Sequence, residues 1–160
     1  MNATIRIAKA ADMPTVLQLI QELANFENEP DAVSITTETL VQFGTGKNPL
    51  FTCFVAENES VIIGIALIYH RFSTWKGKSL HLEDLVVTES YRNKGVGSLL
   101  YNAVMKFAKT HDIPRVSWEV LDWNTNAITF YENTGAHILK DWRIIHFEKQ
   151  QIDSYLANTD

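Results

Sequence analysis

The chain has 160 residues, of which 46% are apolar and 21% are charged. This composition is that of an ordinary globular protein, and the length is sufficient for one domain, which we expect to span residues 1–160. The formal net charge of −5 argues against nucleic acid as a partner and favours a cationic substrate.

Cysteine, histidine and hydropathy patterns exclude several other classes of protein. Cys53 is the only cysteine, which rules out an intrachain disulfide and a cysteine-based zinc site, and its apolar neighbours favour a buried thiol over a nucleophile. The histidines show no metal-binding spacing, so we expect no metal. No apolar run approaches the ~20 residues of a membrane span and no secretory leader pattern is present, so we expect a cytoplasmic protein that does not bind membranes.

The first half of the chain predicts one strand, two helices and a hairpin. Thr4 to Ala8 alternates as a strand does. Asp12 precedes a helical pattern with Pro14 in its first turn and can cap that helix, and a shorter helix begins near Thr36 or Thr37. Strands follow at residues 51–56 and 61–71, joined by a polar turn, and a third strand at about residues 79–87.

The second half continues the alternation of helices and strands. Apolar residues from Val96 to Phe107 recur at helical spacing. The remaining pattern predicts a strand at residues 115–121, a short helix at 126–133 that ends before Gly135, and a last strand at 144–148. The alternation predicts an α/β (α+β) domain.

A glycine loop separates the third of these strands from the helix that begins near Val96. Arg92, Gly95 and Gly97 form the pattern R-x-x-G-x-G. Glycines let the backbone approach a ligand, and a helix start offers unpaired N–H groups to phosphate. A dinucleotide-binding fingerprint requires a third glycine where Leu100 stands, and the stretch at residues 44–47 lacks the other residues of a P-loop. The pattern indicates an anion-binding loop, with a plain connecting turn as the alternative.

A second motif at residues 124–136 fits N-x-x-[AS]-x-x-[FL]-Y-x-x-x-G-A. The two motifs, in this order and at this separation, resemble the GNAT acyltransferase superfamily, and the resemblance covers nearly the whole chain. It implies a GNAT fold, in which helices flank a central, mixed, mostly antiparallel twisted sheet. It also implies acetyl-CoA as the cosubstrate, with its pyrophosphate held by the glycine loop.

Within that superfamily the chain looks like the diamine acetyltransferases, namely the spermidine/spermine group and its thialysine acetyltransferase relatives. The resemblance rests on the segments Glu22–Glu27, Ser73–Lys78, Leu82–Asp84, Leu121–Asn124 and Asp141–Arg143. Trp75-Lys76-Gly77 together with Leu121–Asn124 looks more like the thialysine branch. Lys140 stands where spermine-binding members carry an acidic residue, which argues against long polyamines.

Glu83 is the candidate general base, because the resemblance places the family's catalytic glutamate there, working through water. A primary amine with a pKa of ~10.4 is almost entirely protonated at neutral pH, so its proton must be removed before attack. Asp84 falls on the opposite face of a regular strand, but a bulge, common beside active sites, would bring both carboxylates toward the cleft. A solvated strand edge is the alternative reading of this pair.

Tyr131 is the candidate general acid for the departing coenzyme A sulfur. A thiol of pKa ~8.5 is a fair leaving group, so the phenol need only stabilise developing thiolate charge. The alternative is an aromatic side chain that packs beside Phe130.

Coenzyme contacts are predicted along the third strand, the glycine loop and the second motif. Backbone groups of the strand would pair with the extended pantetheine arm, and Lys94 either adds charge near the phosphates or is solvated. The predicted coenzyme-binding residues are Leu85, Val86, Val87, Arg92, Asn93, Lys94, Gly95, Val96, Gly97, Ser98, Asn124 and Tyr131.

The amine substrate is expected to meet acidic and aromatic side chains. The resemblance carries Phe26 and Glu27 onto substrate-contacting positions, with phenylalanine replacing a frequent tyrosine. Glu119 and Trp142 are candidates for the amine channel, where a tryptophan face suits an ammonium group. Core packing is the equal alternative for the tryptophan. Together with Glu83 and Asp84 they form the predicted substrate site, and for His81 strand packing is favoured over a proton-relay role.

These observations predict a cytoplasmic acetyltransferase that transfers acetyl from acetyl-CoA directly to a primary amine of a small cationic molecule, such as a diamine, a polyamine or thialysine. The family resemblance implies a homodimer. Two alternatives stay open: an enzyme that acts on protein N-termini or lysines, and a non-catalytic acyl-CoA sensor.

Overall fold

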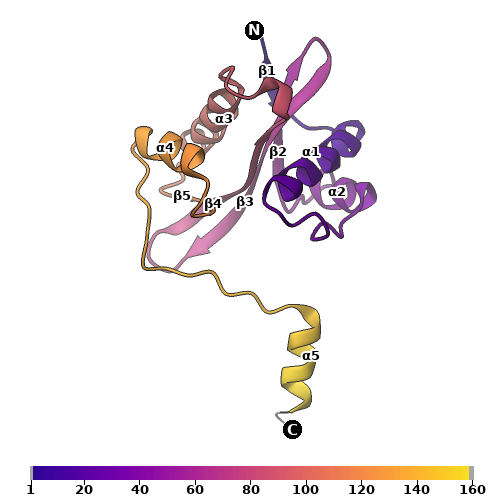
Figure 1. Cartoon of the computed structure of the whole chain (residues 1–160), viewed down its shortest axis with the longest axis vertical. Helices are drawn as coiled ribbons and strands as arrows, with labels where there is room; N and C mark the ends of the chain where they lie inside the picture. The colour runs from indigo at the N-terminus through magenta and orange to yellow at the C-terminus, as the bar shows by residue number, and fades with distance from the viewer. Residues whose placement is uncertain (1, 159–160) are drawn as a thin grey trace. The chain divides into compact units, whose positions relative to one another are not determined.

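The structure is a computed structural model that describes residues 2–158, and the chain divides into two compact units, Met1–Leu121 and Asp122–Asp160. The ends of the predicted domain, residues 1 and 159–160, lie outside the described residues. The first unit is built on a five-stranded sheet (Figure 1). Its strands are β1 (Thr4–Ile7), β2 (Thr52–Asn58), β3 (Val61–Ser73), β4 (Gly77–Val87) and β5 (Val116–Ser117). Its helical elements are η1 (Ala10–Asp12), α1 (Met13–Phe26), α2 (Thr37–Gly44), η2 (Glu89–Tyr91) and α3 (Val96–Thr110).

The strands follow the order β1-β2-β3-β4-β5, with antiparallel pairing except between β4 and β5, which are parallel. The loop between β2 and β3 has two residues, Glu59 and Ser60, with φ of 50° and 66°. Positive φ at both positions is what a tight hairpin turn requires. The mixed, mostly antiparallel sheet predicted from the sequence is confirmed.

Helices cover both faces of the sheet, α1 and α2 on one and α3 on the other (Figure 1). The α3 side buries Val96, Leu100 and Val104 against one set of strand residues. The α1 side buries Val16 and Leu19 of α1 and other strand residues in a second cluster. Both helices present the apolar stripe at helical spacing that the sequence predicts.

Asp12 precedes α1 as expected, but its side chain makes no capping hydrogen bond to that helix. It instead accepts hydrogen bonds from the guanidinium of Arg6 at 2.6 and 3.1 Å and from the backbone N–H of Lys9 at 2.7 Å. Arg6 also donates to Glu57 of β2 at 2.6 Å. The acidic group therefore ties the start of α1 to the sheet rather than capping the helix.

Two strand predictions in the second half of the chain are wrong. The strand expected at residues 115–121 is only two residues long (β5), because among the described residues it pairs with β4 only at Val116 and Ser117. Residues 144–148 form no strand in the described part of the chain. A segment of β-forming composition becomes a strand only where a neighbouring strand completes its hydrogen bonds. Residues 144–148 are instead followed directly by a helix that we did not predict from the sequence, α5 (Lys149–Ala157).

The second unit contains α4 (Thr125–Asn133) and α5. Asn124 caps α4 by accepting a hydrogen bond from the Ala127 backbone N–H at 3.2 Å. Gly135, with φ of 88°, follows the end of α4, as predicted. Within residues 2–158 no helix combines the length and the apolar character needed to cross a bilayer.

Candidate active site

A bulge in β4 places the two predicted carboxylates on one face of the sheet. Leu67 of β3 pairs with Asp84 while the next residue, Ile68, pairs with Leu82, so Glu83 is the extra residue. The bulge resets the alternation of side chains, since Leu82 and Leu85 both pack on the α3 side although they are three residues apart. Asp84, paired with Leu67 of the α1-side cluster, therefore faces α1. The bulge that the sequence analysis considered is confirmed.

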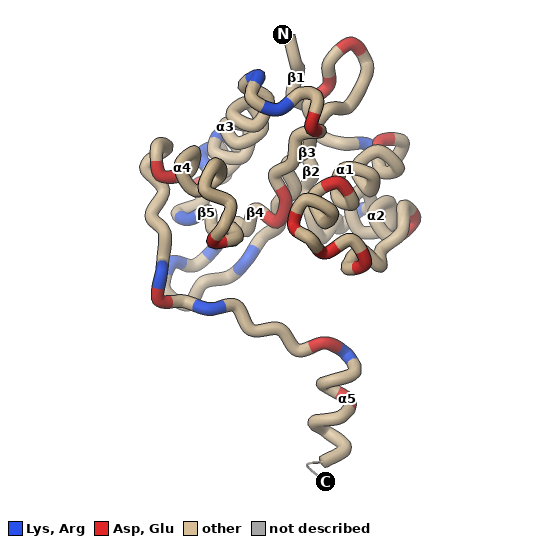
Figure 2. The backbone as a smooth tube through the Cα atoms, in the orientation of Figure 1, with Lys and Arg blue, Asp and Glu red and all other residues tan. Residues whose placement is uncertain are grey.

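Asp84 lies in a crowded acidic environment. Its burial, followed by the negative charges of Glu83 and Glu27, raises the pKa of Asp84 to about 7. Loss of solvent also raises the pKa of Glu27, which follows the last residue of α1. Figure 2 shows the acidic positions of β4 and of the loop after α1. A partly buried carboxyl group beside two further acidic side chains forms a site that a cation would stabilise.

Glu83 is more exposed than Asp84, and its side chain meets groups from two strands. Its Oε2 atom lies 3.5 Å from Nε2 of His81 on the same strand, and the Glu83 side chain is 51% exposed to solvent. A hydrogen bond links Glu83 to Tyr69 of β3, and burial together with the Glu83 charge raises the pKa of Tyr69. Glu83 is therefore positioned by neighbours yet reachable by solvent or substrate.

The glycine loop adopts the backbone that its sequence predicts. Asn93 and Gly95 both have left-handed conformations, with φ of 58° and 82°, and a Cβ at Gly95 would meet no atom within 4 Å. Gly95 is the N-cap residue of α3 and offers no side-chain cap. The start of α3 therefore has no side-chain cap, and the space beside the Cβ position of Gly95 is open, an arrangement that suits an anion at the first N–H groups of the helix.

The two cations of the loop are held by local contacts. Arg92 donates from Nε to the Val87 carbonyl at 3.0 Å, and its guanidinium lies 5.2 Å from the ring centre of Phe26. Lys94 donates to the Ser90 carbonyl at 2.8 Å. Arg92 therefore joins the glycine loop to the end of α1, and Lys94 is tied to the loop rather than fully solvated.

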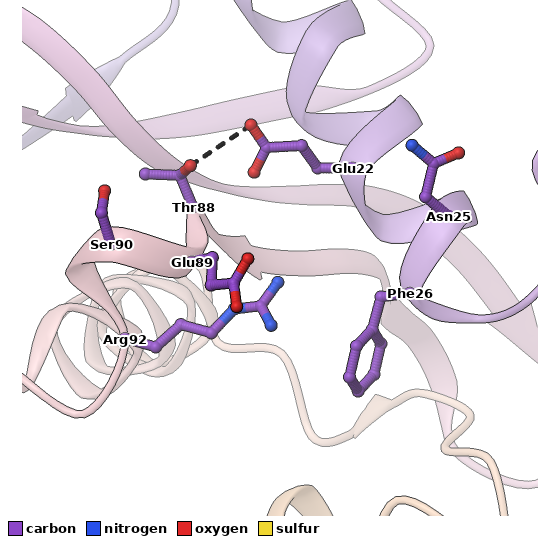
Figure 3. A pocket seen from close by; sticks show the side chains of 7 residues that line it. All are labelled: Glu22, Asn25, Phe26, Thr88, Glu89, Ser90 and Arg92. Carbon is purple, nitrogen blue, oxygen red and sulfur yellow. Dashed lines mark hydrogen bonds between the residues drawn. The ribbon is translucent and has the colours of Figure 1, made fainter.

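A pocket of about 730 Å³ opens between the end of α1 and the segment after β4. Figure 3 shows the Arg92 guanidinium beside the Phe26 ring and the Thr88 hydroxyl directed at Glu22, to which it donates at 3.2 Å. The lining residues are Glu22, Asn25, Phe26, Thr88, Glu89, Ser90 and Arg92. The pocket thus brings a predicted substrate residue and a predicted coenzyme residue to one place within the first unit.

The edge of β4 beyond His81 is open on the side of β5. Within the described chain, the ladder between these strands consists of Leu80 with Val116 and His81 with Ser117. Leu82 and residues 84–87 therefore pair with β3 on one side and have no strand partner on the other within the described chain. An extended amide chain can pair with such an edge, which fits a pantetheine arm along Leu85 to Val87. The Val87 carbonyl is already taken by Arg92.

Three predicted site residues belong to the second unit. Tyr131 is buried on α4, with its ring 5.4 Å from that of Phe130. Asn124 uses its side-chain oxygen to cap α4, and Trp142 is 69% exposed. Their roles toward coenzyme and amine stay predictions. Glu119, in the first unit, lies 3.3 Å from His81.

Sequence reasoning did not identify Tyr69 as a neighbour of Glu83, and it treated Asp84 as secondary. The signal for Asp84 is two adjacent carboxylates inside an apolar strand, but the bulge that partly buries one of them depends on strand register. Cys53 is buried as expected, and burial raises the pKa of its thiol to about 12. Residues 2–158 contain no group of three or more side chains able to hold a metal ion.

Comparison with known proteins identifies the family of the chain. The model of the acetyltransferase (GNAT) family matches residues 15–136. A thialysine N-epsilon-acetyltransferase from Sus scrofa is 37% identical over 158 residues, covering 92% of this chain and 93% of that protein. Spermidine/spermine N(1)-acetyltransferase-like protein 1 from Homo sapiens is 34% identical over 92% of this chain and 23% of its own length.

Solved structures share the fold. An integron cassette protein from the mobile metagenome of V. cholerae superimposes with a TM-score of 0.78 over 98% of each chain, at 20% sequence identity. With the family match over most of the chain and relatives aligned along nearly its whole length, the chain belongs to the GNAT family of acetyltransferases, acyltransferases of the EC 2.3.1 class.

Proposed function

We propose that this chain transfers an acetyl group from acetyl-CoA to a primary amine of a small cationic substrate, a diamine, a polyamine or a thialysine-like amino acid. The observation that carries the proposal is the group of three carboxylates, Glu27, Glu83 and Asp84, in which burial and then the charges of Glu83 and Glu27 raise the pKa of Asp84 to about 7. An ammonium group bound beside them would offset those negative charges. The names of the relatives support the same substrate class.

The donor side of the proposal rests on the open end of α3 and the edge of β4. GNAT enzymes use acyl-CoA. The N–H groups from Gly95 to Ser98 would hold the pyrophosphate, since the loop leaves open space beside Gly95. Leu85 would pair its backbone with the pantetheine amides along the unpaired edge, together with the N–H of Val87, whose carbonyl accepts from Arg92. The residues present therefore fit the coenzyme.

In the proposed reaction Glu83, through water, accepts the proton of the bound ammonium group. The neutral amine nitrogen then attacks the thioester carbonyl carbon, the carbon–sulfur bond breaks, and the sulfur takes a proton from Tyr131. The product nitrogen loses its extra proton to give the amide, and that proton restores the Tyr131 phenol through water. Transfer is direct within a ternary complex, because Cys53 is buried and burial raises the pKa of its thiol to about 12. The activity belongs to a single domain over residues 1–160. A homodimer and a cytoplasmic location stay predictions.

The decisive experiment incubates the protein with acetyl-CoA and putrescine, spermidine, spermine, thialysine, lysine or an N-terminal peptide, and follows the products by mass spectrometry. We expect acetylated thialysine or short diamine in preference to spermine, with Lys140 disfavouring the longer chain. A Lys140→Glu variant should accept spermine better while its rate with thialysine changes less. Acetylation of the peptide alone would contradict the proposed substrate class.

A further inference from the structure

His81 is a buried histidine whose two ring nitrogens face groups of different chemistry. It is 2% exposed and lies on β4, two residues before Glu83. Its Nδ1 atom is 2.9 Å from Nη1 of Arg71 on β3. Its Nε2 atom is 3.5 Å from Oε2 of Glu83 and 3.3 Å from Oε2 of Glu119. The ring also lies against Tyr69, with 5.1 Å between ring centres.

These neighbours determine which nitrogen carries the proton. A guanidinium has donors and no acceptor, so Nδ1 of His81 must accept from Arg71 with its lone pair. A neutral imidazole has one N–H group, which is therefore at Nε2. Nε2 is also the nitrogen that lies near the carboxylates of Glu83 and Glu119, which come from β4 and from the segment just after β5.

His81 lies at the point where the pairing between β4 and β5 ends. The ladder between β4 and β5 ends at His81, and the bulge at Glu83 follows two residues later. Beyond this point β4 has no partner on the β5 side among the described residues, so backbone pairing no longer fixes the relative positions of Glu83 and Glu119. The Nε2 atom of His81 lies within 3.5 Å of a carboxylate oxygen of each.

We propose that His81 is a positioning residue for the acetyl transfer, with its tautomer fixed by Arg71 so that Nε2–H holds Glu83 and Glu119 at the amine site. This inference rests on the proposed function, because it takes Glu83 as the group that receives the amine proton. The charged and titratable groups around His81 are Arg71 and Tyr69 from β3, Glu83 from β4 and Glu119 after β5.

A matched pair of substitutions separates positioning from packing. The amide of His81→Gln can place an N–H group near the Nε2 position, whereas His81→Asn can only replace the acceptor for Arg71. We expect His81→Asn to lower kcat roughly 10- to 100-fold, the size of effect that a small misplacement of a catalytic group produces. His81→Gln should restore most of that loss. Equal kcat values for the two variants would overturn the proposal.

A double-mutant cycle tests whether His81 acts through Glu83. Glu83→Gln alone should lower kcat about 10²- to 10⁴-fold, as expected for loss of a general base. Adding His81→Asn to Glu83→Gln should then cost little more, whereas an equal further loss would refute the inference. In His81→Asn alone, the ascending limb of the pH–rate profile should move to higher pH, because a donor to the ionised carboxylate pair is lost. An unmoved profile would refute it.

The tautomer gives a readout that does not depend on activity. In the ¹⁵N-labelled protein at pH 8, long-range ¹H–¹⁵N spectra should show His81, assigned by its absence in His81→Asn, with the proton on Nε2. Arg71→Met, at an exposed position, should populate the other tautomer. A proton on Nδ1 in the wild type overturns the inference even if the enzyme is active. If instead no amine is acetylated while the Nε2–H tautomer is observed, the proposed function fails and not the geometry.

Discussion

Replacing Asp84 with asparagine should stabilise the protein at alkaline pH and inactivate it. The pKa of Asp84 rises from 3.8 to about 7 in the folded chain, through burial and then the charges of Glu83 and Glu27. At 1.36 kcal/mol per pKa unit this corresponds to about 4 kcal/mol against the ionised folded state. Relaxation and water reduce the effect, so we expect Asp84→Asn to gain about 2–4 kcal/mol above pH 7.

The sign follows from which state binds the proton more tightly. Because the folded carboxyl holds its proton up to about pH 7, wild-type stability falls as pH rises from about 4 to 7 through this one group, and Asp84→Asn lacks that fall. Thermal melts at pH 5 and pH 8 should therefore give a larger Tm gain at pH 8, about 5–15 °C. Asp31→Asn, on an exposed loop, is the matched control. A Tm gain that is the same at both pH values would refute the reasoning.

Three further substitutions or reagents test other parts of the site. Gly95→Ala should cost about 1 kcal/mol of stability, because alanine disfavours a φ of 82°, and should weaken acetyl-CoA binding by calorimetry; unchanged affinity would contradict the anion-binding role of the loop. Tyr131→Phe should lower kcat more than acetyl-CoA affinity, whereas equal losses would make Tyr131 a binding residue. Cys53, whose thiol is buried with its pKa raised to about 12, should react with a thiol reagent in urea but not in buffer, and rapid labelling of the native protein would show that this part of the core opens.

The sequence predicts the scaffold of the site better than its electrostatics. Apolar periodicity locates β3, β4 and α3, and the glycine pattern predicts the loop between β4 and α3, because these features depend on local spacing. The orientation of Asp84 depends on a single extra residue in the pairing of β4 with β3, which no local pattern specifies. The same holds for Tyr69 and Arg71, whose contacts with Glu83 and His81 require the register of two strands.

The failed predictions near the C-terminus have a related cause. Residues 115–121 and 144–148 both have strand-forming composition, yet a strand exists only where an edge accepts it. The ladder of β5 stops beside His81, two residues before the bulge at Glu83. A bulge bends the strand that carries it, so pairing with a straight neighbour does not continue past it.

The bulge in β4 explains why catalytic and coenzyme functions can share one strand. Before it, His81 is buried in a complete ladder and can be held by Arg71. At the bulge, Glu83 and Asp84 face the same side of the sheet, which concentrates negative charge near α1. After it, residues 85–87 have a free backbone edge that leads to the open start of α3. Deleting Glu83 rather than substituting it should therefore weaken coenzyme binding as well as abolish catalysis, because removal of the extra residue straightens β4 and lets pairing with β5 continue along its edge, while Asp84, Leu85 and Val86 keep their faces. Glu83→Gln keeps the register and should retain coenzyme affinity, and calorimetry on the two variants would distinguish a role of the residue from a role of the bulge.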